Sequence, residues 1–304
     1  MLKKSKVFIV TEYIGFNHNS TAYYWAKIAL HFNDLFDLCV ICPDNSYTRD
    51  FSEKYPIKVN FVRDIGVDKN RFFSRVLGQI SFAFLLNRKI FLLVKSDQVV
   101  ITGTNPIISV LFTAFLKQIK GFKWLVVCHD LFPDNLLPSG VMKKGSLFKV
   151  VSKFFSFVYR APDTIAPIGR DMAEKLVEKG VCRNKIHVVS NWADHTNIFP
   201  FPKEKSSIIE GLGWKDNIVF CFFGNMGRTQ GISELLDAID SVRSSDARFL
   251  FIGDGSEQNK VRRFVDNEGK KNSYYYGRLD LDDNNLGLNS GDIAIVSLSK
   301  GMYG

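Results

Sequence analysis

Long apolar runs are missing from this chain of 304 residues, so no membrane-spanning helix is expected. The longest apolar segments, Ile80–Leu86 and Ile90–Val94, are separated by three polar residues. Each is much shorter than the roughly 18 residues that a span requires. The N-terminus is basic, but its apolar part covers only Val7–Val10, which is too short for a signal peptide. This segment predicts the first strand of a cytoplasmic protein.

Cysteine is also scarce, and the five cysteines lack the spacing of a metal site. An odd number of cysteines without a signal peptide predicts buried free thiols in a reducing compartment. The five histidines are scattered as well, so we expect no metal cofactor. No G-x-G-x-x-G follows the first strand and no G-x-S-x-G occurs, which disfavours a dinucleotide dehydrogenase and a serine hydrolase.

Acidic residues are few in the first two thirds of the chain. Residues 1–200 contain 27 Lys and Arg against 16 Asp and Glu, a net charge of +11, whereas residues 201–304 have a net charge of −2. The basic part predicts an anionic ligand or surface as partner. Lys143–Arg160 has five cations, five aromatic residues and no acid, which fits either adsorption to anionic lipid or a helix packed on a sheet. No module for nucleic-acid recognition is visible, so nucleic acid is not expected as a partner.

Short apolar strands alternate with amphipathic helices along most of the chain. Residues 1–190 repeat this order up to an expected strand at Lys185–Val189, which predicts a parallel sheet covered by helices. Residues 191–216 contain two prolines, two glycines and little periodicity, and we expect an interdomain linker there. Residues 217–304 hold four more strands, the last at Asp292–Ser297, or about half of a doubly wound domain. The prediction is two Rossmann-like α/β domains that face a cleft, the second one incomplete.

The stretch Ile218–Gly231 carries the strongest local pattern. Six apolar residues predict a strand buried on both faces, and a glycine-rich turn leads from it into a helix at Ile232. Such a turn directs backbone N–H groups at an anion, and Arg228 adds a planar cation suited to phosphate. The alternative is that the glycines only reverse the chain, because glycine motifs often occur without a ligand.

His129 is the best candidate for direct chemistry. It follows the expected buried strand Phe122–Cys128 and precedes Asp130, so its imidazole could donate to a substrate oxygen or phosphate. The alternative is a histidine that is hydrogen-bonded within the core. No catalytic triad accompanies it, because the motif of a nucleophilic serine is missing.

Five segments carry a more specific pattern: HDLFPDNLLPSGV at 129–141, KIHVVSNWAD at 185–194, FFGNMGRTQG at 222–231, LFIGDGSE at 250–257 and YYYGRL at 274–279. In this order they resemble family 4 glycosyltransferases, which are retaining, metal-independent enzymes of the GT-B fold that use nucleotide-sugar donors. The branch they resemble builds bacterial surface polysaccharide and includes fucosamine transferases.

The resemblance implies roles for particular residues. His129 would contact the transferred sugar or stabilise charge at the reaction centre. The implied donor-binding residues are Gly15, Gly224, Asn225, Arg228, Gln230, Arg278 and Leu279, the last two beside the nucleobase. The donor would be a nucleotide-diphosphate sugar, and the acceptor a saccharide on a polyprenyl diphosphate. The protein would then be peripheral, at the anionic inner face of the membrane.

Two departures from the family pattern qualify these roles. Many members have an arginine and a lysine where this chain has Asn225 and Gln230, so Arg228 would have to supply the positive charge. The family also carries two glutamates eight positions apart, just beyond the strand that here is Asp292–Ser297. This chain has no such pair and ends at Gly304, so we expect a truncated donor domain with little turnover. The alternatives are a non-catalytic membrane-adsorbing subunit and a nucleotide-sugar 2-epimerase on the same architecture.

Overall fold

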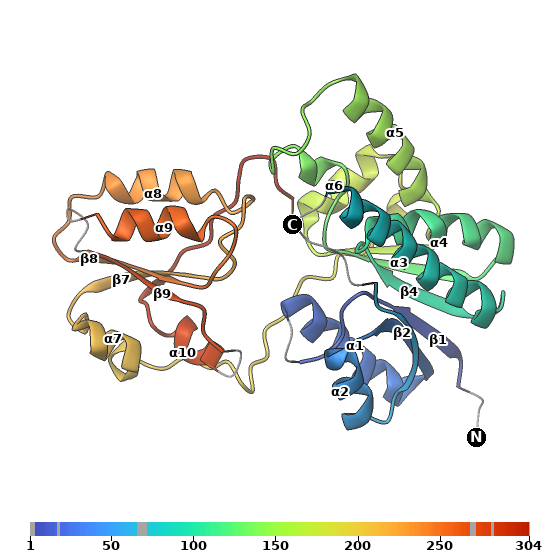
Figure 1. Ribbon diagram of the computed structural model, residues 1–304, viewed down its shortest axis with the longest axis horizontal. Coiled ribbons are helices and arrows are strands. Elements are labelled where there is room, and N and C mark those ends of the chain that lie inside the picture. Colours follow the sequence, from blue (N-terminus) through green and yellow to red (C-terminus); the bar gives the residue numbers. More distant parts are fainter. Residues whose placement is uncertain (1–3, 17–18, 66–71, 268–271, 281–282, 304) are drawn as a thin grey trace. The chain divides into compact units, whose positions relative to one another are not determined.

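The computed structural model of the chain describes residues 4–16, 19–65, 72–267, 272–280 and 283–303. The chain forms two compact units, each built around its own parallel β-sheet (Figure 1). The first unit comprises Met1–Asn135, Lys143–Asn191 and Tyr303–Gly304, and the second comprises Leu136–Met142 and Trp192–Met302. No helix within the described ranges combines the length and the apolar content needed to cross a membrane.

The first sheet has six parallel strands in the order β3-β2-β1-β4-β5-β6. They are β1 (Lys6–Val10), β2 (Asp37–Asp44), β3 (Lys58–Arg63), β4 (Val99–Gly103), β5 (Lys123–Cys128) and β6 (Thr164–Pro167). The strand order reverses between β1 and β4. Open α/β sheets bind ligands at such a switch point, outside the carboxyl ends of the strands. The loops after β1, β4 and β5 are therefore the first place to look for a site in this unit.

Helices cover both faces of the first sheet. They are α1 (Ser20–Leu35), α2 (Ser46–Lys54), α3 (Phe72–Leu93), α4 (Ile107–Lys120), α5 (Ser146–Arg160) and α6 (Arg170–Glu178), with short 3₁₀ turns at Asp134–Leu136 and Arg183–Lys185. Buried side chains of α3, α4, α5 and α6 share one core cluster, and those of α1 and α2 belong to another. The two groups of helices therefore lie on opposite faces of the sheet (Figure 1).

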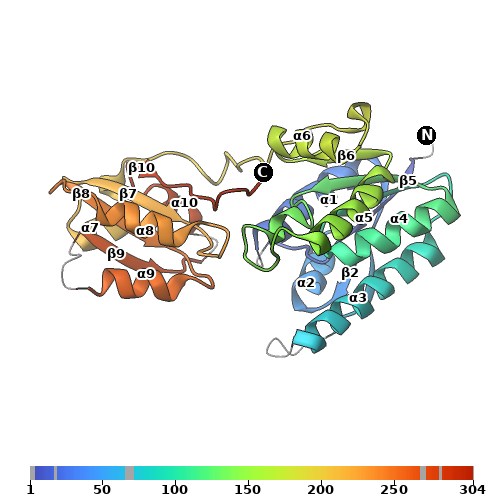
Figure 2. The same cartoon turned by 90° about the horizontal axis from the view of Figure 1, so that it is seen from above.

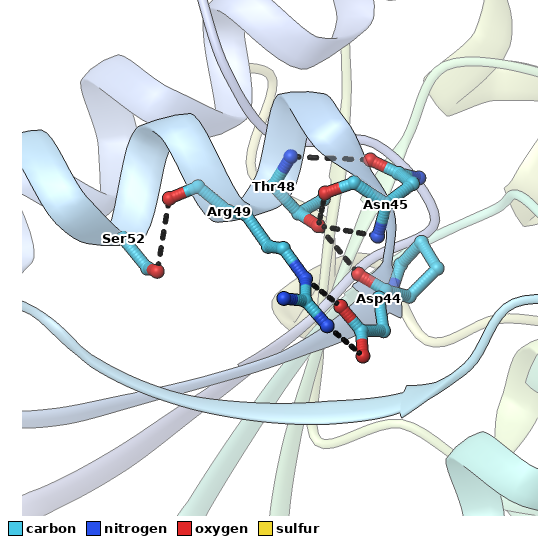
Figure 3. Close-up of polar contacts among 6 residues, drawn as sticks. Asp44, Asn45, Thr48, Arg49 and Ser52 are labelled. Atoms are coloured by element: carbon cyan, nitrogen blue, oxygen red, sulfur yellow. Dashed lines mark hydrogen bonds and ion pairs between the residues drawn. The ribbon is translucent and has the colours of Figure 1, made fainter.

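Two of these helices begin at asparagine caps that the sequence encodes locally. The side chain of Asn19 accepts a hydrogen bond from the Ala22 N–H at 2.8 Å, as its position before α1 predicts. Asn45 begins α2 in the same way: its side chain accepts from the Thr48 N–H, and the Thr48 hydroxyl accepts from the Asn45 N–H, each at 3.1 Å (Figure 3). This reciprocal cap fixes the start of α2, a helix that the sequence pattern did not predict.

Helix α3 runs without a break through Asn87, where the sequence left an interruption open. The Asn87 amide is buried and donates to the Ala83 carbonyl at 2.9 Å and to the Ser109 hydroxyl at 3.0 Å. The Thr113 hydroxyl in turn donates to Asn87 Oδ1 at 2.9 Å. Because its polar atoms are satisfied, Asn87 joins α3 to α4 instead of ending the helix.

Two predicted strands are corrected by the structure. Lys185–Val189 runs along β6, where the His187 and Val189 N–H groups donate to the Ile165 and Pro167 carbonyls, but it forms only an isolated bridge between Ile165 and Ile186, and Val188 and Val189 are exposed. Asp292–Ser297 pairs only through β10 (Ile293–Ala294), because the chain beyond it turns toward the glycine-rich loop. In both cases the apolar residues predicted a strand that tertiary packing did not support.

The second sheet has four parallel strands in the order β10-β7-β8-β9. Besides β10 these are β7 (Ile218–Phe223), β8 (Ala247–Ile252) and β9 (Ser273–Gly277), and the helices are α7 (Ser207–Leu212), α8 (Ile232–Asp240), α9 (Gln258–Val265) and α10 (Asn284–Leu288). One core cluster holds buried side chains of α8 and α9, and a second one lies under α7 and α10. Both faces of this sheet are therefore covered by helices in the described part of the chain.

The predicted linker at residues 191–216 is partly ordered structure of the second unit. Ile208 and Ile209 on α7 are buried in the same core as Trp214. In addition, the Ser206 hydroxyl lies 2.7 Å from that of Ser290, a buried contact across the unit. Two prolines and two glycines suggested a flexible connection, but one turn and a half of helix with two isoleucines is enough to anchor this segment.

Four of the five cysteines are buried, as the sequence predicted, and Cys182 is exposed. Burial raises the pKa of the Cys42 and Cys221 thiols to about 12, so both remain protonated and unreactive near neutral pH. These residues therefore contribute packing to the two cores and not chemistry.

Candidate functional site

The glycine-rich turn of the second unit has the strand–turn–helix form that the sequence predicted. It leaves β7 at Gly224, whose φ is +154°, and enters α8 at Gly231, whose φ is +60°. Met226 is fully buried in the middle of the turn and anchors it to the core. The turn is therefore a rigid connection and not a mobile loop.

The turn is joined to the loop that follows β8. The Met226 N–H donates to the Asp254 carbonyl at 2.6 Å, and the Glu257 N–H donates to the Met226 carbonyl at 2.8 Å. Glycine is required where the two loops approach: a Cβ on Gly255 would lie 2.5 Å from the Met226 carbonyl oxygen. Both loops follow neighbouring parallel strands, so their backbones meet at the carboxyl edge of the sheet.

Several N–H groups of the turn remain available. Within the described residues, the backbone N–H groups of Asn225, Gly227, Arg228 and Thr229 have no hydrogen-bond acceptor. The N-terminus of α8 follows them directly and adds the positive end of its dipole. A cluster of free N–H groups at a helix N-terminus has the form of an anion-binding site.

The polar side chains of the turn surround Gly227. A Cβ at this position would lie 2.8 Å from both Asn225 Nδ2 and Gln230 Oε1, so these two amides pack over the glycine. Arg228 is exposed and forms no ion pair with the residues that the structure describes. Its guanidinium is therefore free to meet a ligand at the edge of the turn.

Arg278 and Leu279, which follow β9, differ in what they offer. Arg278 Nη1 lies 3.5 Å from Asp254 Oδ2, and both side chains are largely exposed. The Leu279 side chain instead packs on the core beneath α7 and α10, close to Gly287. A ligand beside this strand end would meet the Arg278 side chain but only the backbone of Leu279.

A serine-rich segment beyond β10 also contacts the turn, which the sequence did not predict. The Ser297 hydroxyl donates to the Gln230 carbonyl at 2.6 Å, and the Ser299 N–H donates to the Thr229 carbonyl at 2.8 Å. The Ser299 hydroxyl donates to the Arg228 carbonyl at 3.2 Å. These bonds hold the carbonyl side of the turn, which leaves its N–H side open.

In the first unit, His129 lies at the carboxyl end of β5, as predicted. Its imidazole packs edge-on to Trp25 with 6.5 Å between ring centroids. The next residue, Asp130, is held by its backbone N–H, which donates to the Thr104 hydroxyl at 3.3 Å. Burial lowers the pKa of His129 and the Asp130 charge opposes this shift, while burial raises the pKa of Asp130. The two side chains thus form a partly buried polar pair beside the switch point.

Gly15 lies in the loop after β1 with a φ of +136°. Its N–H donates to the Ala22 carbonyl at 3.3 Å, and a Cβ on this residue would lie 3.3 Å from the Tyr47 carbonyl oxygen. Glycine at this position therefore allows the loop to pack closely against α2. Because the N–H is already occupied, it is not available to a phosphate in this conformation.

A cavity of about 310 Å³ opens beside this loop. The residues that line it come from the end of β2, from the loops after β1, β2, β3 and β4, and from α2 and α3: Glu12, Tyr13, Pro43, Asn45, Tyr47, Asp64, Ile65, Gly78, Gln79, Phe82 and Pro106. Asn45, the cap of α2 in Figure 3, belongs to this wall. No motif in the sequence signals this cavity, because its walls join residues that are more than fifty positions apart.

Glu12 is one of the two carboxylates in the wall of this cavity. Burial raises its pKa above 4.5; the hydrogen bond from the Tyr13 hydroxyl, at 2.9 Å, opposes the shift, and the nearby Asp64 charge adds to it. A raised pKa means that the folded state holds this proton more tightly than the unfolded chain does. The charged form of Glu12 therefore destabilises the fold at neutral pH, and this cost disappears as the pH falls through the raised pKa.

Replacing Glu12 by glutamine is accordingly expected to raise the unfolding free energy near neutral pH. The difference between Glu12→Gln and the unaltered protein should shrink as the pH falls toward about 4.5, where Glu12 is protonated in the folded state. Urea unfolding from neutral to acidic pH measures this difference in unfolding free energy. Glu53→Gln on the exposed face of α2 is the matched control, and equal pH profiles for all three proteins would contradict the expectation.

Among the residues that the structure describes, no group of three His, Cys, Asp or Glu side chains lies close enough together to hold a metal ion. Within these residues, neither candidate region, the turn of the second unit or the cavity of the first, contains such a cluster.

Comparison with known proteins identifies the class to which these features belong. The family described as "Glycosyl transferase 4-like domain" matches residues 21–192. WbjE of Pseudomonas aeruginosa, named as a probable glycosyltransferase, is 38% identical over 302 residues, which cover 99% of this chain and 76% of the relative. The chain therefore belongs to the family 4 glycosyltransferases, and it is a glycosyltransferase by its family.

A second relative and a solved structure agree with this placement. WcaI of Escherichia coli (strain K12), whose name refers to colanic acid biosynthesis, is 23% identical over 191 residues, or 61% of this chain and 47% of the relative. Anabaena Alr3699/HepE, solved in complex with UDP, superposes with a TM-score of 0.67 at 14% identity and covers 95% of this chain and 73% of its own. The likeness confirms the predicted GT-B fold. The predicted roles of single residues and the expected truncation stay predictions.

Proposed function

We propose that this glycosyltransferase moves a sugar from a nucleotide-diphosphate donor to a lipid-linked saccharide, with retention of anomeric configuration, in cell-surface polysaccharide synthesis. The family supports the transfer reaction. The name of WcaI supports a polysaccharide product, and the UDP and UDP-glucose complexes of Anabaena Alr3699/HepE support a nucleotide-sugar donor.

The observation that carries the donor assignment is the set of free N–H groups on the turn of the second unit. The bond between the anomeric carbon and the diphosphate breaks, and an acceptor hydroxyl oxygen bonds to the same carbon. The hydroxyl proton passes to the leaving phosphate oxygen. The turn N–H groups, the N-terminus of α8 and Arg228 would stabilise the negative charge that develops on the diphosphate. We expect no metal requirement, because these groups supply the positive charge.

His129 would act on the transferred sugar. With its pKa lowered by burial, the imidazole is neutral near pH 7 and offers one donor and one acceptor nitrogen. A neutral donor can hydrogen-bond a sugar hydroxyl or the ring oxygen without repelling the cationic character that develops at the anomeric carbon. Asp130, held by Thr104, would favour the orientation of this ring.

The cavity of the first unit would receive the acceptor sugar. Its polar side chains include Glu12, Asn45, Asp64 and Gln79, and Tyr13 and Tyr47 add aromatic surface. Carboxylates and amides bind sugar hydroxyls, and aromatic rings pack on the apolar face of a pyranose. A volume of about 310 Å³ suits one or two sugar rings, and the two carboxylates would disfavour an acidic acceptor sugar.

Replacing Arg228 by alanine is expected to weaken UDP binding about 10- to 100-fold, because a charge-assisted hydrogen bond to phosphate is lost. Isothermal titration with UDP measures the change. Arg243→Ala removes an exposed arginine of the same unit and should bind UDP as the unaltered protein does. Equal affinities for Arg228→Ala and the control would remove Arg228 from the site.

A transfer assay separates the proposed function from its alternatives. The protein is incubated with labelled UDP-sugars, with and without undecaprenyl-diphosphate saccharides, in the presence and absence of EDTA. Sugar transfer to the lipid-linked acceptor supports the proposal. Conversion of the donor alone into a new sugar nucleotide would indicate an epimerase. UDP binding without either reaction would contradict transfer by residues 1–304 and is the result expected of a truncated donor domain or of a non-catalytic subunit.

A further inference from the structure

Three neighbouring helices of the first unit are free of acidic residues. Helices α3, α4 and α5 lie side by side on the same face of the sheet and contribute to one core cluster (Figure 2). They have 22, 14 and 15 residues, and none contains Asp or Glu. The predicted basic segment Lys143–Arg160 corresponds to α5, so the structure extends that pattern to two further helices.

The outward faces of these helices carry large apolar side chains. On α3 the exposed ones recur at helical spacing, from Leu77 through Phe84, which is 60% exposed, to Phe91. Phe115 on α4 is 64% exposed and Leu147 on α5 is 67% exposed. The exposed apolar residues of this face are Leu77, Ile80, Phe84, Phe91, Leu92, Phe115, Ile119, Leu147, Val150, Phe154 and Phe157. We call this set, with its basic neighbours, the α3–α5 face.

Basic side chains lie among these apolar residues. Lys120 Nζ is 5.0 Å from the centroid of the Phe91 ring, and the Arg160 guanidinium is 6.0 Å from that of Phe157. Arg88, Lys149 and Lys153 are exposed on the same helices. Cations that lie over exposed aromatic rings, with no carboxylate on the helices, match the chemistry of an anionic headgroup layer.

A groove lies next to the cavity assigned to the acceptor. It has a volume of about 690 Å³ and lies between β3, α3 and α4. Its walls are mainly apolar, with Ile80, Phe84, Leu85 and Phe112, and at its inner end it shares Asp64 and Ile65 with the cavity. Exposed residues of the α3–α5 face, Ile80 and Phe84, therefore line a groove that borders the polar pocket assigned to the acceptor sugar.

We propose that the α3–α5 face binds an anionic lipid bilayer and that the groove admits the lipid part of the acceptor from it. The proposal rests on the proposed function for the acceptor, but the bilayer contact itself does not depend on the transfer reaction. Basic residues give electrostatic attraction to the surface, and the aromatic and aliphatic side chains insert at the level of the headgroups. The position of this mainly apolar groove beside the cavity, with Asp64 and Ile65 in both walls, favours lipid over nucleic acid or a second protein as occupant.

Co-sedimentation with vesicles tests the bilayer contact directly. The vesicles contain one part phosphatidylglycerol to two parts phosphatidylcholine, with phosphatidylcholine alone for comparison. Lys149→Glu/Lys153→Glu is expected to weaken binding to the anionic vesicles about 30-fold or more, because each basic residue near the surface contributes about 1 kcal/mol. Phe84→Ser/Phe115→Ser is expected to weaken it about tenfold through lost apolar insertion.

Matched controls change charge and apolar area elsewhere. Lys205→Glu/Arg243→Glu makes the same charge change in the second unit, and Leu35→Ser/Val242→Ser removes exposed apolar side chains outside the α3–α5 face. Both should bind vesicles as the unaltered protein does. UDP titration of every variant shows whether the donor site is intact. A failure of the donor assignment can therefore be distinguished from a failure of the bilayer proposal.

Equal vesicle binding by the face variants and the controls would overturn the proposal. The same holds if binding is as strong on phosphatidylcholine alone, or if the face variants only convert a dimer into a monomer, because the face would then be an interface between copies of the chain. Loss of binding in the face variants with unchanged UDP affinity supports it.

Discussion

Replacing Gly253 by alanine is expected to destabilise the second unit by at least about 3 kcal/mol and to abolish UDP binding. Gly253 has a φ of +131°, where a side chain is strained. A Cβ would clash with the Gly224 carbonyl oxygen and lie 2.9 Å from its carbonyl carbon. Neither backbone can retreat easily, since the Gly224 N–H donates to Ile252 and the Gly253 N–H donates to Gly277, at 2.9 and 2.7 Å. The substitution therefore forces apart the two loops that build the proposed anion site.

Urea unfolding combined with hydrogen exchange measures this loss and assigns it to the second unit. Gly211→Ala is the matched control: the residue lies in α7, and a Cβ added to it would meet no other described atom within 4 Å. That change should be neutral or stabilise the fold by up to about 1 kcal/mol, because alanine favours a helix. A Gly253→Ala protein with the stability and UDP affinity of the control would show that the two loops are not held as described.

Replacing Lys179 by methionine is expected to lower the unfolding free energy by about 3–5 kcal/mol. Lys179 Nζ lies 2.5 Å from Asp134 Oδ2, and the two side chains are only 5% and 8% exposed. Methionine fills a similar volume but leaves the Asp134 carboxylate buried without a counter-charge. Asp134 belongs to the loop that follows His129, so transfer activity is also expected to fall as this loop loosens.

The double variant Lys179→Met/Asp134→Leu should recover most of the lost stability, since it removes both charges together. The exposed pair Arg183–Glu174 supplies a control of the same kind: Arg183→Met should cost much less stability than Lys179→Met, because solvent screens an exposed ion pair. Thermal unfolding of the four proteins gives the comparison. If Lys179→Met costs no more than Arg183→Met, the buried ion pair does not anchor the loop.

The local parts of the fold could be predicted from the sequence because they depend on neighbouring residues. The apolar run Ile218–Phe223 followed by glycines and an amphipathic segment led to the correct strand, turn and helix. Prediction was wrong where local pattern and tertiary context disagree. Lys185–Val189 has the apolar residues of a strand but forms only an isolated bridge, and α7 is short enough to be hidden among prolines and glycines.

The candidate site divides in the same way. His129 was predicted because it follows an apolar strand, and Arg228 because it lies in the glycine-rich turn after another; Arg278 was implied by the family resemblance. Leu279 follows β9 as well, but its side chain turns into the core, which the strand position could not reveal. The sequence did not single out Glu12, because its neighbours in the cavity come from distant elements, among them α2 and α3.

The sequence by itself determined the class of this protein, its family and the strand–turn–helix form around Gly224–Gly231. These properties follow from patterns among residues that are close in the sequence, and such patterns do not depend on how distant segments pack. Only the tertiary structure decided which N–H groups of the turn stay free, which carboxylates share the acceptor cavity and which helices combine into the α3–α5 face. Those properties depend on residues far apart in the chain. Their packing decides which backbone N–H groups have a hydrogen-bond partner and which side chains are buried or exposed.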